Sequence, residues 1–322
     1  MATATEATAS AGGLVPHTPF QFQQAEKEAR PARIAFDGPS GSGRTLTALR
    51  VASALGENIA VIETEHGHSH QYGAEVPFQS TVLTDFNPDH LFAALASAAV
   101  LGHDVVVIDS YTQFWTGTNG MIDKVQTDTR PGYGGQNEAW HKNRPMERRI
   151  TEALLAYPGH LVMTLRSDTE TVTEPDAQGR TITRKVAVKP KQRADIEYDL
   201  DVAGTLGPVA SLHIGKSRIP ALVNKVEYEP GVEMGKVIRA WAEEGKPTGD
   251  WLGFVRRARD PEATSKGLRQ LWLEVSKARC QAMAVLDEHG QHLTLADLIG
   301  ERGRYLAQQE AASPAHAQAG AA

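Results

Sequence analysis

Cysteine is almost absent from this sequence, because Cys280 is the single one among 322 residues. One cysteine cannot form a disulfide within the chain, and it cannot build a zinc site from several thiolates. A chain that uses neither device fits a reducing compartment, so we expect a cytoplasmic protein.

Long hydrophobic runs are missing as well. No uninterrupted apolar stretch approaches the roughly 18 residues of a membrane-spanning helix, so the sequence predicts neither an integral membrane protein nor a membrane partner. No Lys or Arg precedes Lys27, and the opening segment MATATEATASAGGL contains no apolar run. We therefore expect neither a secretory signal nor an arginine-rich transit peptide.

The third absence is an excess of positive charge. The chain carries 33 Lys+Arg against 39 Asp+Glu, which gives a formal net charge of −6. Any contact with nucleic acid must therefore come from a local basic patch. Hydrophobic residues make up 41% and charged residues 22%, proportions that are typical of a folded globular chain rather than a disordered one.

Segments with strand and helix character alternate along most of the chain. The pattern predicts helices at 46–55, 87–102 and 138–156, and strands at 33–36, 59–62, 105–108, 160–165, 200–203 and 211–214. Between 169 and 188 the pattern is β-rich, with a hairpin turn at 176–179. This alternation is typical of an α/β fold whose central sheet is mostly parallel and flanked by helices.

Composition divides the chain into four predicted parts. They are a flexible N-terminal arm at 1–30, the α/β core at 31–246, a small helical C-terminal segment at 247–309 and a disordered tail at 310–322. The two ends are rich in small and polar residues. In the C-terminal segment, Leu268, Leu271, Trp272 and Val275 follow the helical spacing i, i+3, i+4, i+7, which predicts an amphipathic helix. Thr294 with Asp297 is a capping pair that opens a last helix.

The strongest local signal is a glycine-rich turn between the first strand and the first helix. It consists of Gly38, Pro39, Ser40, Gly41, Ser42, Gly43, Arg44 and Thr45. The frame G-x-x-x-x-G-[K/R]-T in this setting is that of a P-loop, whose backbone N–H groups and helix N-terminus bind phosphates. The Thr45 hydroxyl is then the expected Mg²⁺ ligand, and ATP with Mg²⁺ the expected cofactor pair. A glycine-rich turn without a ligand is the alternative.

Arg44 stands where a P-loop has lysine. Arginine keeps the charge, but its planar fork does not replace a compact ammonium between two phosphates. Two interpretations stay open. In the first, arginine at this position preserves nucleotide binding but slows hydrolysis. In the second, the site functions equally well with lysine or arginine.

Carboxylates follow two of the apolar strands. Asp109 ends the third predicted strand and has the form of a Walker B residue that holds Mg²⁺. Glu65 follows the second strand and is our candidate for the base that activates water, with Glu63 as its rival. The alternative for each is a polar strand end in solvent. His66, His68 and His70 come next, but the loop offers no scaffold for three metal ligands.

A basic patch lies in the β-rich region. Between 180 and 193 there are six basic residues and no acidic one: Arg180, Arg184, Lys185, Lys189, Lys191 and Arg193. On a hairpin these side chains could follow a phosphate backbone, so we expect them to bind single-stranded DNA. A solvated charged loop is the competing interpretation.

The segments GPSGSGRT, AVIETEHG, VVVIDS, HLVMTLRS and HIGKSRIPAL together resemble the RecA-like recombination ATPases. The resemblance is greatest to the phage and mobile-element nucleotide-binding proteins linked to single-strand annealing, and it extends from about residue 32 to 241. It implies a RecA-like P-loop NTPase core, with Glu65 as the catalytic glutamate and Asp109 as the Mg²⁺ carboxylate. It also implies that Lys216 and Arg218 act on the nucleotide of a neighbouring subunit. Thr164 stands where the family has a phosphate-sensing glutamine.

The resemblance implies Mg²⁺-dependent ATP hydrolysis coupled to the binding and annealing of single-stranded DNA in a homo-oligomer, either a ring or a filament. A single-strand DNA-binding protein is a further candidate partner. Phe22-Gln-Gln-Ala25 resembles a segment by which some relatives polymerise, and an edge strand explains it equally well. Arg44 and Thr164 favour an alternative, a nucleotide-gated DNA-binding module that does not hydrolyse ATP. A small-molecule P-loop kinase ranks last. It would need an Arg-rich lid over the acceptor site, whereas the only basic cluster in the sequence lies on a hairpin rich in β-branched residues.

Overall fold

A computed structural model describes residues 24–129, 135–175, 181–190, 196–207, 210–247 and 249–312, with the backbone alone over 168–175, 181–190 and at 312. The hairpin turn predicted at 176–179 and the first half of the Phe22–Ala25 segment lie outside these residues. The division of the chain into four parts stays a prediction.

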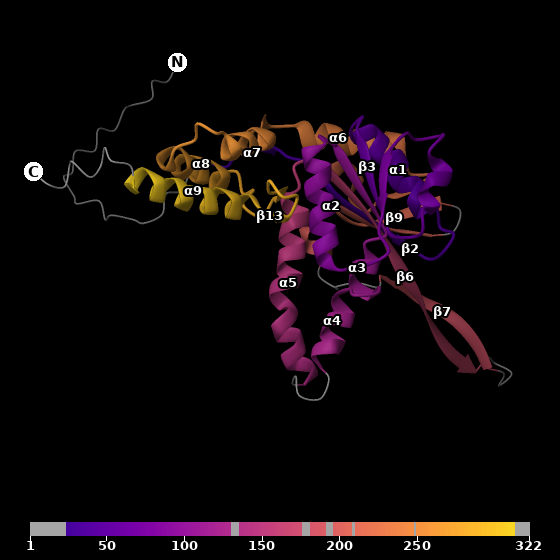
Figure 1. Ribbon diagram of the computed structural model, residues 1–322. Coiled ribbons are helices and arrows are strands. Elements are labelled where there is room, and N and C mark those ends of the chain that lie inside the picture. The colour runs from indigo at the N-terminus through magenta and orange to yellow at the C-terminus, as the bar shows by residue number, and fades with distance from the viewer. Residues whose placement is uncertain are drawn as a thin grey trace, which may run out of the picture.

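A nine-stranded sheet forms the centre of the described chain (Figure 1). Its strands are β2 (Arg33–Gly38), β3 (Ile59–Glu63), β4 (Gln79–Val82), β5 (Val105–Asp109), β6 (His160–Pro175), β7 (Thr181–Pro190), β8 (Val202–Leu206), β9 (Ser211–Ser217) and β10 (Val226–Tyr228). The order is β10-β9-β8-β2-β6-β5-β3-β4, and β7 pairs with the outer part of β6. From β8 to β4 every pairing is parallel, whereas β9, β10 and β7 join antiparallel. The mostly parallel α/β sheet predicted from the alternation is confirmed.

Alternate residues of the parallel strands point to opposite faces of the sheet. Ile34 and Phe36 of β2 pack with helices α1 (Arg44–Leu55) and α6 (Val232–Glu243), while Ala35 packs with the helices of the other face. That other face is covered by α2 (Pro88–Val100) and α5 (Gln136–Ala156). Burial on both faces explains why Ile34–Phe36 of β2 and almost all of β3 and β5 are apolar, without a polar alternation.

Local signals place the helix ends close to the predicted positions. Asn87 caps α2, because its side chain accepts a 3.2 Å hydrogen bond from the Asp89 N–H, and Pro88 occupies the first turn. Gly56 ends α1 and donates its N–H to the Ala52 carbonyl. Helix α5 begins at Gln136, two residues before the prediction.

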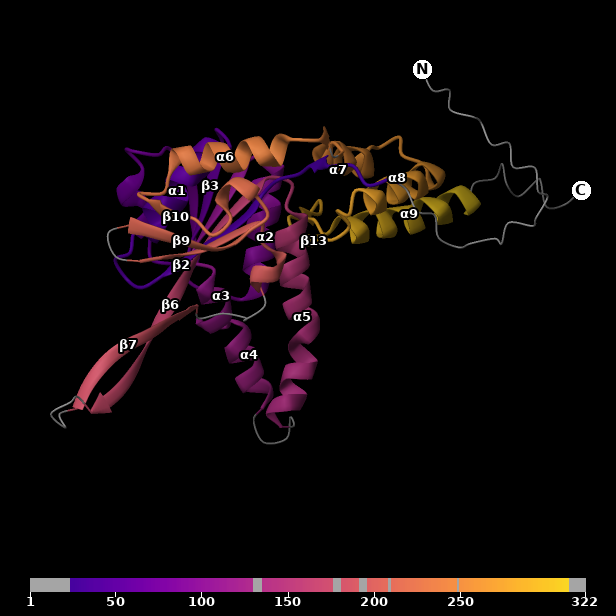
Figure 2. The ribbon, with the colours of Figure 1, turned by 180° about the vertical axis from the view of Figure 1, so that it is seen from behind.

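Two arms leave the same side of the sheet, the side where the parallel strands end (Figures 1 and 2). One is helical: α3 (Thr112–Thr116) leads to α4 (Met121–Asp128), which returns along α5. The other is the hairpin of β6 and β7. Strand β6 pairs with β2 and β5 inside the sheet, then continues outward from Ser167 with β7 alone. A single strand therefore belongs to both the core and the arm.

The C-terminal segment packs around its own apolar cluster. It contains α7 (Trp251–Arg259), α8 (Ser265–Lys277), the hairpin β12 (Ala284–Leu286) with β13 (His292–Thr294), and α9 (Leu295–Ala312). The predicted capping pair is confirmed, because the Asp297 N–H donates to Thr294 Oγ1 at 3.0 Å and the Thr294 hydroxyl donates to Asp297 Oδ2 at 2.6 Å. Leu268, Leu271 and Val275 are buried as their spacing predicts, whereas Trp272 is 40% exposed.

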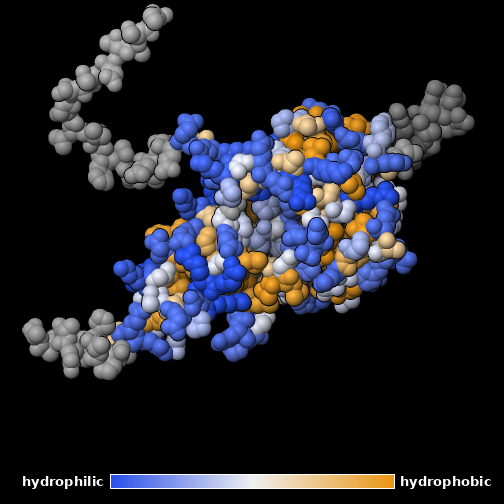
Figure 3. Space-filling view, turned by 90° about the horizontal axis from the view of Figure 1, so that it is seen from above, coloured by the Kyte–Doolittle hydropathy of each residue, from blue (hydrophilic) through white to orange (hydrophobic). Residues whose placement is uncertain are grey.

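Short elements complete the chain. Strand β1 (Glu28–Ala29) pairs in parallel with β11 (Lys246–Pro247), and 3₁₀ turns lie at His68–Tyr72, Ile196–Asp199 and Pro220–Leu222. Seen from above (Figure 3), the apolar residues of the described chain lie in patches between hydrophilic ones. None of the helices among the described residues is both long and apolar enough to span a membrane.

The contact between α1 and α6 generates a stability prediction. A Cβ at Gly235 would lie 2.7 Å from the Val51 carbonyl oxygen and 2.7 Å from Ala54 Cβ. We expect Gly235→Ala to lower the free energy of unfolding by about 1–3 kcal/mol in urea denaturation. The control is Gly300→Ala on α9, where the nearest atom is the flexible end of Arg304 at 3.6 Å. That change should raise stability by up to about 1 kcal/mol. Equal effects would contradict the packing argument.

Candidate nucleotide site

The glycine-rich turn closes between β2 and α1 at the carboxyl edge of the sheet. Gly41 and Gly43 have φ of 78° and 88°, a left-handed region that suits glycine, and α1 begins directly after Gly43. Gly38 must also lack a side chain, because a Cβ there would lie 2.7 Å from the Leu206 carbonyl oxygen. The positive end of the α1 dipole therefore faces the loop, as a phosphate site requires.

Arg44 is folded back onto this loop. Its Nη1 donates to the carbonyl oxygens of Gly38 and Pro39, the latter at 2.7 Å. Its Nε is buried and has no hydrogen-bond partner among the described residues, and the same holds for the Ser42 hydroxyl. Buried polar atoms that lack partners are costly unless a ligand satisfies them. These two atoms therefore fit a phosphate held in the loop.

Asp109 joins three elements beneath the loop. Its Oδ2 accepts a 2.8 Å hydrogen bond from the Thr45 hydroxyl of α1, and its Oδ1 accepts one from the Thr164 hydroxyl of β6. Asp109 is 2% exposed, and burial raises its pKa to about 6, against the lowering effect of the two hydroxyls. Carboxylate and hydroxyl oxygens are ligands that Mg²⁺ accepts, so this pair fits the predicted cation. Thr164 holds the carboxylate, a role that its place in the sequence did not indicate.

The two glutamates after β3 have different surroundings. Glu63 is fully buried, and its carboxylate accepts the N–H groups of Glu65 and Ser69 at 2.8 and 3.1 Å. Its oxygens thus hold the loop in shape. The side chain of Glu65 is 16% exposed, and its charge interacts with those of Arg44 and Asp109. The structure brings Glu65 to the P-loop edge, and we keep it as the candidate base.

Arg166 is a site residue that sequence reasoning passed over. Its Nε donates to Glu65 Oε1 at 2.8 Å. Burial alone would raise the pKa of Glu65, but the hydrogen bond and charge of Arg166 outweigh it, so the pKa lies below its usual value. The available signal was its position as the first charged residue after the apolar part of β6, at the same edge as the P-loop.

Asp37 is a second missed residue. It lies next to the P-loop and accepts hydrogen bonds from the hydroxyls of Ser167 and Thr205, both at 2.7 Å. Burial raises its pKa, and the two hydroxyls only partly offset that effect. Asp37 thus ties the start of the β6–β7 arm to the strand that carries the P-loop.

The histidines after Glu65 do not converge. His70 Nε2 lies 2.8 Å from the Ser80 hydroxyl, and the 3₁₀ turn at His68–Tyr72 directs the chain back to β4. In the part of the chain that the structure describes, no group of three or more His, Cys, Asp or Glu side chains is arranged to hold a metal.

Lys216 and Arg218 lie at the opposite edge of the sheet. Lys216 pairs with Ala203 near the start of β8, whereas the P-loop follows the far end of β2. Three residues of strand, or about 10 Å, separate Ala35, the β2 partner of Ala203, from Gly38, and two strand spacings, or about 10 Å more, separate β9 from β2. The Lys216 ammonium donates to the Glu197 carbonyl, and burial and then the nearby Arg218 charge lower its pKa. The two residues cannot reach the P-loop of their own chain.

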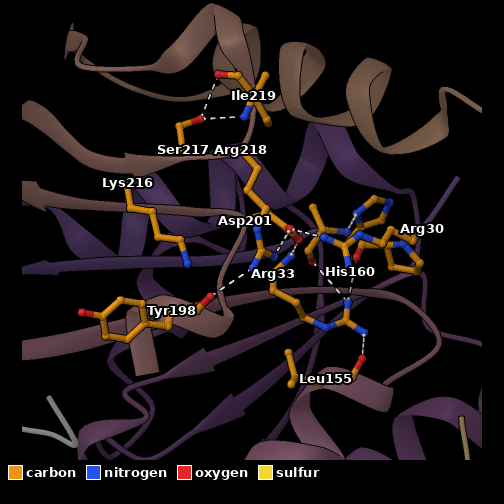
Figure 4. Close-up of polar contacts among 12 residues, drawn as sticks. Arg30, Arg33, Leu155, His160, Tyr198, Asp201, Lys216, Ser217, Arg218 and Ile219 are labelled. Atoms are coloured by element: carbon orange, nitrogen blue, oxygen red, sulfur yellow. Dashed lines mark hydrogen bonds and ion pairs between the residues drawn. The ribbon is translucent and has the colours of Figure 1, made fainter. Parts of the chain in front are cut away.

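Arg218 belongs to a cluster around the buried Asp201 (Figure 4). Asp201 Oδ1 accepts hydrogen bonds from Arg30 at 2.7 Å and from Arg218 at 2.9 Å, and Oδ2 accepts the Arg33 N–H at 2.9 Å. The Arg33 guanidinium donates to the carbonyls of Leu155 and Gly159, both at 2.8 Å. In the isolated chain, Arg218 thus has a structural role.

The six predicted DNA-binding residues are only partly described. Arg184, Lys185 and Lys189 lie on β7, so the backbone of the arm carries them away from the sheet (Figure 2). Arg180, Lys191 and Arg193 lie outside the described residues.

Comparison with known proteins agrees with this geometry. The chain matches the AAA domain family over residues 30–217, more than half of its length. The chain therefore belongs to the AAA domain family, a family of P-loop ATPases. The P-loop ATPase class predicted from the motifs is confirmed, and the narrower resemblance to phage recombination proteins stays a prediction. No curated protein matches the chain.

Several solved structures match the chain, and one of them is an ATPase from the type III secretion system of pathogenic bacteria. It is 15% identical, with 84% of this chain and 78% of that chain covered, and the TM-score is 0.36. A superposition this loose carries no argument about function.

The burial of Asp109 generates a pH prediction. Its pKa of about 6 in the folded chain lies above the ordinary aspartate value of 3.8. Without Mg²⁺, this group's contribution to stability is therefore present below pH 4 and lost as pH rises through 6. Asp109→Asn removes the titration. Above pH 6 the variant should be more stable than the unsubstituted chain by about 1–3 kcal/mol in urea, while it loses Mg²⁺-nucleotide binding.

The control is Asp128→Asn. Hydrogen bonds from Lys142 and Asn143 lower the pKa of Asp128, so this change should have the opposite sign and reduce stability at neutral pH. An Asp109→Asn variant that follows the pH profile of the unsubstituted chain would contradict the assignment.

Proposed function

We propose that this protein is a Mg²⁺-dependent ATPase whose turnover is coupled to single-stranded DNA bound on the β6–β7 arm. The observation that carries the proposal is the convergence at one sheet edge of the P-loop, the Thr45–Asp109 pair and Glu65. These are the parts needed to hold phosphates, bind a divalent cation and accept a proton.

Each side chain has a distinct role in this proposal. The loop amides and Arg44 hold the phosphates, and Thr45 with Asp109 holds Mg²⁺. Bound Mg²⁺-ATP supplies the phosphoryl group that water attacks. Glu65 takes the proton from that water, and its partial burial keeps competing solvent away from the carboxylate.

The DNA part of the proposal is supported by the position of the arm and by the basic residues on its β7 side, since the β6 side carries Asp168, Glu170 and Glu174. Six basic residues and no acidic one lie between 180 and 193 in a chain with a net charge of −6. The arm begins at Ser167, next to both Asp37 and Arg166, so a ligand on it lies close to the candidate nucleotide site. We extend the proposal to recombination by strand annealing on the sequence resemblance alone.

A homo-oligomer is part of the same proposal. Lys216 and Arg218 lie too far from their own P-loop, so they can contribute charge only to a nucleotide held by another copy. In a ring or filament, Arg218 would have to leave Asp201, which keeps Arg30 as its partner. If the active form is such an assembly, we expect the specific ATPase activity to rise with protein concentration.

The test is steady-state ATP hydrolysis with and without a single-stranded oligonucleotide, at low and moderate salt. Turnover that DNA stimulates, with a stimulation that fades as salt increases, supports the proposal. The matched variant is Glu65→Gln. We expect it to lose about 10²–10⁴-fold in turnover while it still binds nucleotide, because only the base is removed.

Glu75→Gln is the control for that variant, since Glu75 is an exposed partner of Arg50 and should leave turnover unchanged. Loss of nucleotide binding in Glu65→Gln would contradict the assigned role. If DNA does not change the rate of ATP hydrolysis, the proposed coupling to DNA is wrong and only the ATPase activity remains.

The second candidate is a nucleotide-gated DNA-binding module without hydrolysis. The observation that favours it is the Arg44 guanidinium, which is bonded to the loop carbonyls of Gly38 and Pro39 rather than free. An arginine in this position binds phosphate through a planar fork and not as a point charge.

Arg44→Lys separates the two candidates. If the chain is an attenuated ATPase, we expect turnover to rise about tenfold, equivalent to one regained charge-assisted hydrogen bond in the transition state. Arg50→Lys is the matched control, because it makes the same exchange on the exposed side of α1. Saturable Mg²⁺-ATP binding without turnover, in both the unsubstituted chain and Arg44→Lys, would favour the second candidate.

A further inference from the structure

Arg166 lies at the residue where β6 leaves the sheet. Its Cα partner on β2 is Gly38, the last residue of that strand, and the next residue of β6, Ser167, already pairs with Pro190 of β7. Arg166 is therefore the last core residue of β6, and the arm begins one peptide bond later. Because Arg166 and Ser167 are consecutive residues of one strand, a rotation of the arm about its base also rotates the backbone of Arg166.

The contacts of Arg166 lead to the candidate base. Its backbone N–H donates to Thr112 Oγ1 at 2.8 Å, which fixes the main chain against α3, and its Nε donates to Glu65 Oε1 at 2.8 Å. The Arg166 side chain is 42% exposed, so the main chain is held more firmly than the guanidinium. Movement at this point is easiest at the bond to Glu65.

A carboxylate in this pair is a weaker base. The guanidinium occupies one carboxylate oxygen and stabilises the charged form, so Glu65 accepts a proton less readily than a free carboxylate does. Arg44 adds a second positive charge near Glu65, and Asp109 a negative one. Of these groups, Arg166 alone belongs to the strand that forms the arm.

The arm is joined to the site by a second bond. Ser167 donates its hydroxyl to Asp37 Oδ2 at 2.7 Å, and Asp37 is the residue before Gly38 of the P-loop. Consecutive residues of one strand thus contact the base on one side and the P-loop strand on the other. The start of the arm is connected to both halves of the candidate site.

We propose that Arg166 is a positioning residue that holds the Glu65 carboxylate in an ion pair at rest and releases it when single-stranded DNA binds along the β6–β7 arm. This inference rests on the proposed function. It adds a regulatory contact that makes turnover low without DNA, even when nucleotide and Mg²⁺ are bound.

The experiment measures kcat and KM for ATP with and without a single-stranded oligonucleotide. In Arg166→Ala, we expect basal kcat to rise about 3- to 10-fold, KM for ATP to stay unchanged, and DNA to add little further. Arg166→Lys, which can form the ion pair with a single donor, should restore part of the low basal rate and of the stimulation.

Arg257→Ala is the matched control. Arg257 pairs with Glu274 in the C-terminal segment and has a side chain that is 49% exposed, so its loss removes a comparable ion pair far from the site. Basal turnover and stimulation should both stay as in the unsubstituted chain.

The outcomes separate this inference from the function beneath it. If the unsubstituted chain hydrolyses ATP and responds to DNA while Arg166→Ala has the same basal rate and the same stimulation, the inference is overturned and the ATPase proposal stands. A fall in basal kcat would also overturn it, because Arg166 would then assist catalysis. An unsubstituted chain without turnover in any condition overturns the ATPase proposal itself. If turnover is present but indifferent to DNA, release by DNA is refuted, and the basal rate of Arg166→Ala still decides the resting ion pair.

Discussion

The hydroxyl–carboxylate chain Thr45–Asp109–Thr164 is the constraint on which the candidate site depends. It joins the P-loop helix α1 to β5 and β6, the two strands that follow β2 in the sheet order. Since Asp109 is buried, its charge is costly without partners, and the two hydroxyls are the groups that offset this cost in the described chain. The P-loop, the candidate Mg²⁺ site and β6, the strand that continues into the arm, are therefore held in fixed positions relative to one another. A ligand that replaces the Thr45 hydroxyl on Asp109 would therefore change the contacts of the P-loop, the candidate Mg²⁺ site and β6 together.

A second carboxylate organises the opposite edge. The Asp201 carboxylate accepts hydrogen bonds from the side chains of Arg30 and Arg218 and from the backbone N–H of Arg33. The Arg33 guanidinium in turn donates to carbonyl oxygens at the end of α5. The two buried aspartates differ in their partners. Asp109 is surrounded by neutral hydroxyls and has a raised pKa, which suits a group that waits for a cation. Asp201 already has its cations, so this edge is a structural joint in the single chain.

The sequence predicted the parts of the molecule that depend on local signals. Apolar strands, the Asn87 cap and the Thr294–Asp297 pair follow from spacing and from side chains a few residues apart. The same local frame predicted the P-loop, Asp109 and Glu65 as site residues, and the structure brings them to one edge of the sheet. Strand β4 escaped prediction because its four residues are exposed at a sheet edge, and α4 because it is short and polar. Arg166, Asp37 and the role of Thr164 depend on contacts between residues 55 to 168 positions apart, and no local pattern encodes them.

The two ends of the arm emerge side by side, because Ser167 pairs with Pro190 at its base. Everything outward of that pair can lengthen, shorten or change in sequence without moving the points where the chain enters and leaves the core. Selection can therefore act on the two regions separately. The buried core tolerates little variation, whereas the hairpin tolerates more at the positions that do not contact a ligand. Among descendants of one ancestral chain, partner preference would be expected to diverge in the hairpin while the chemistry at its base stays the same.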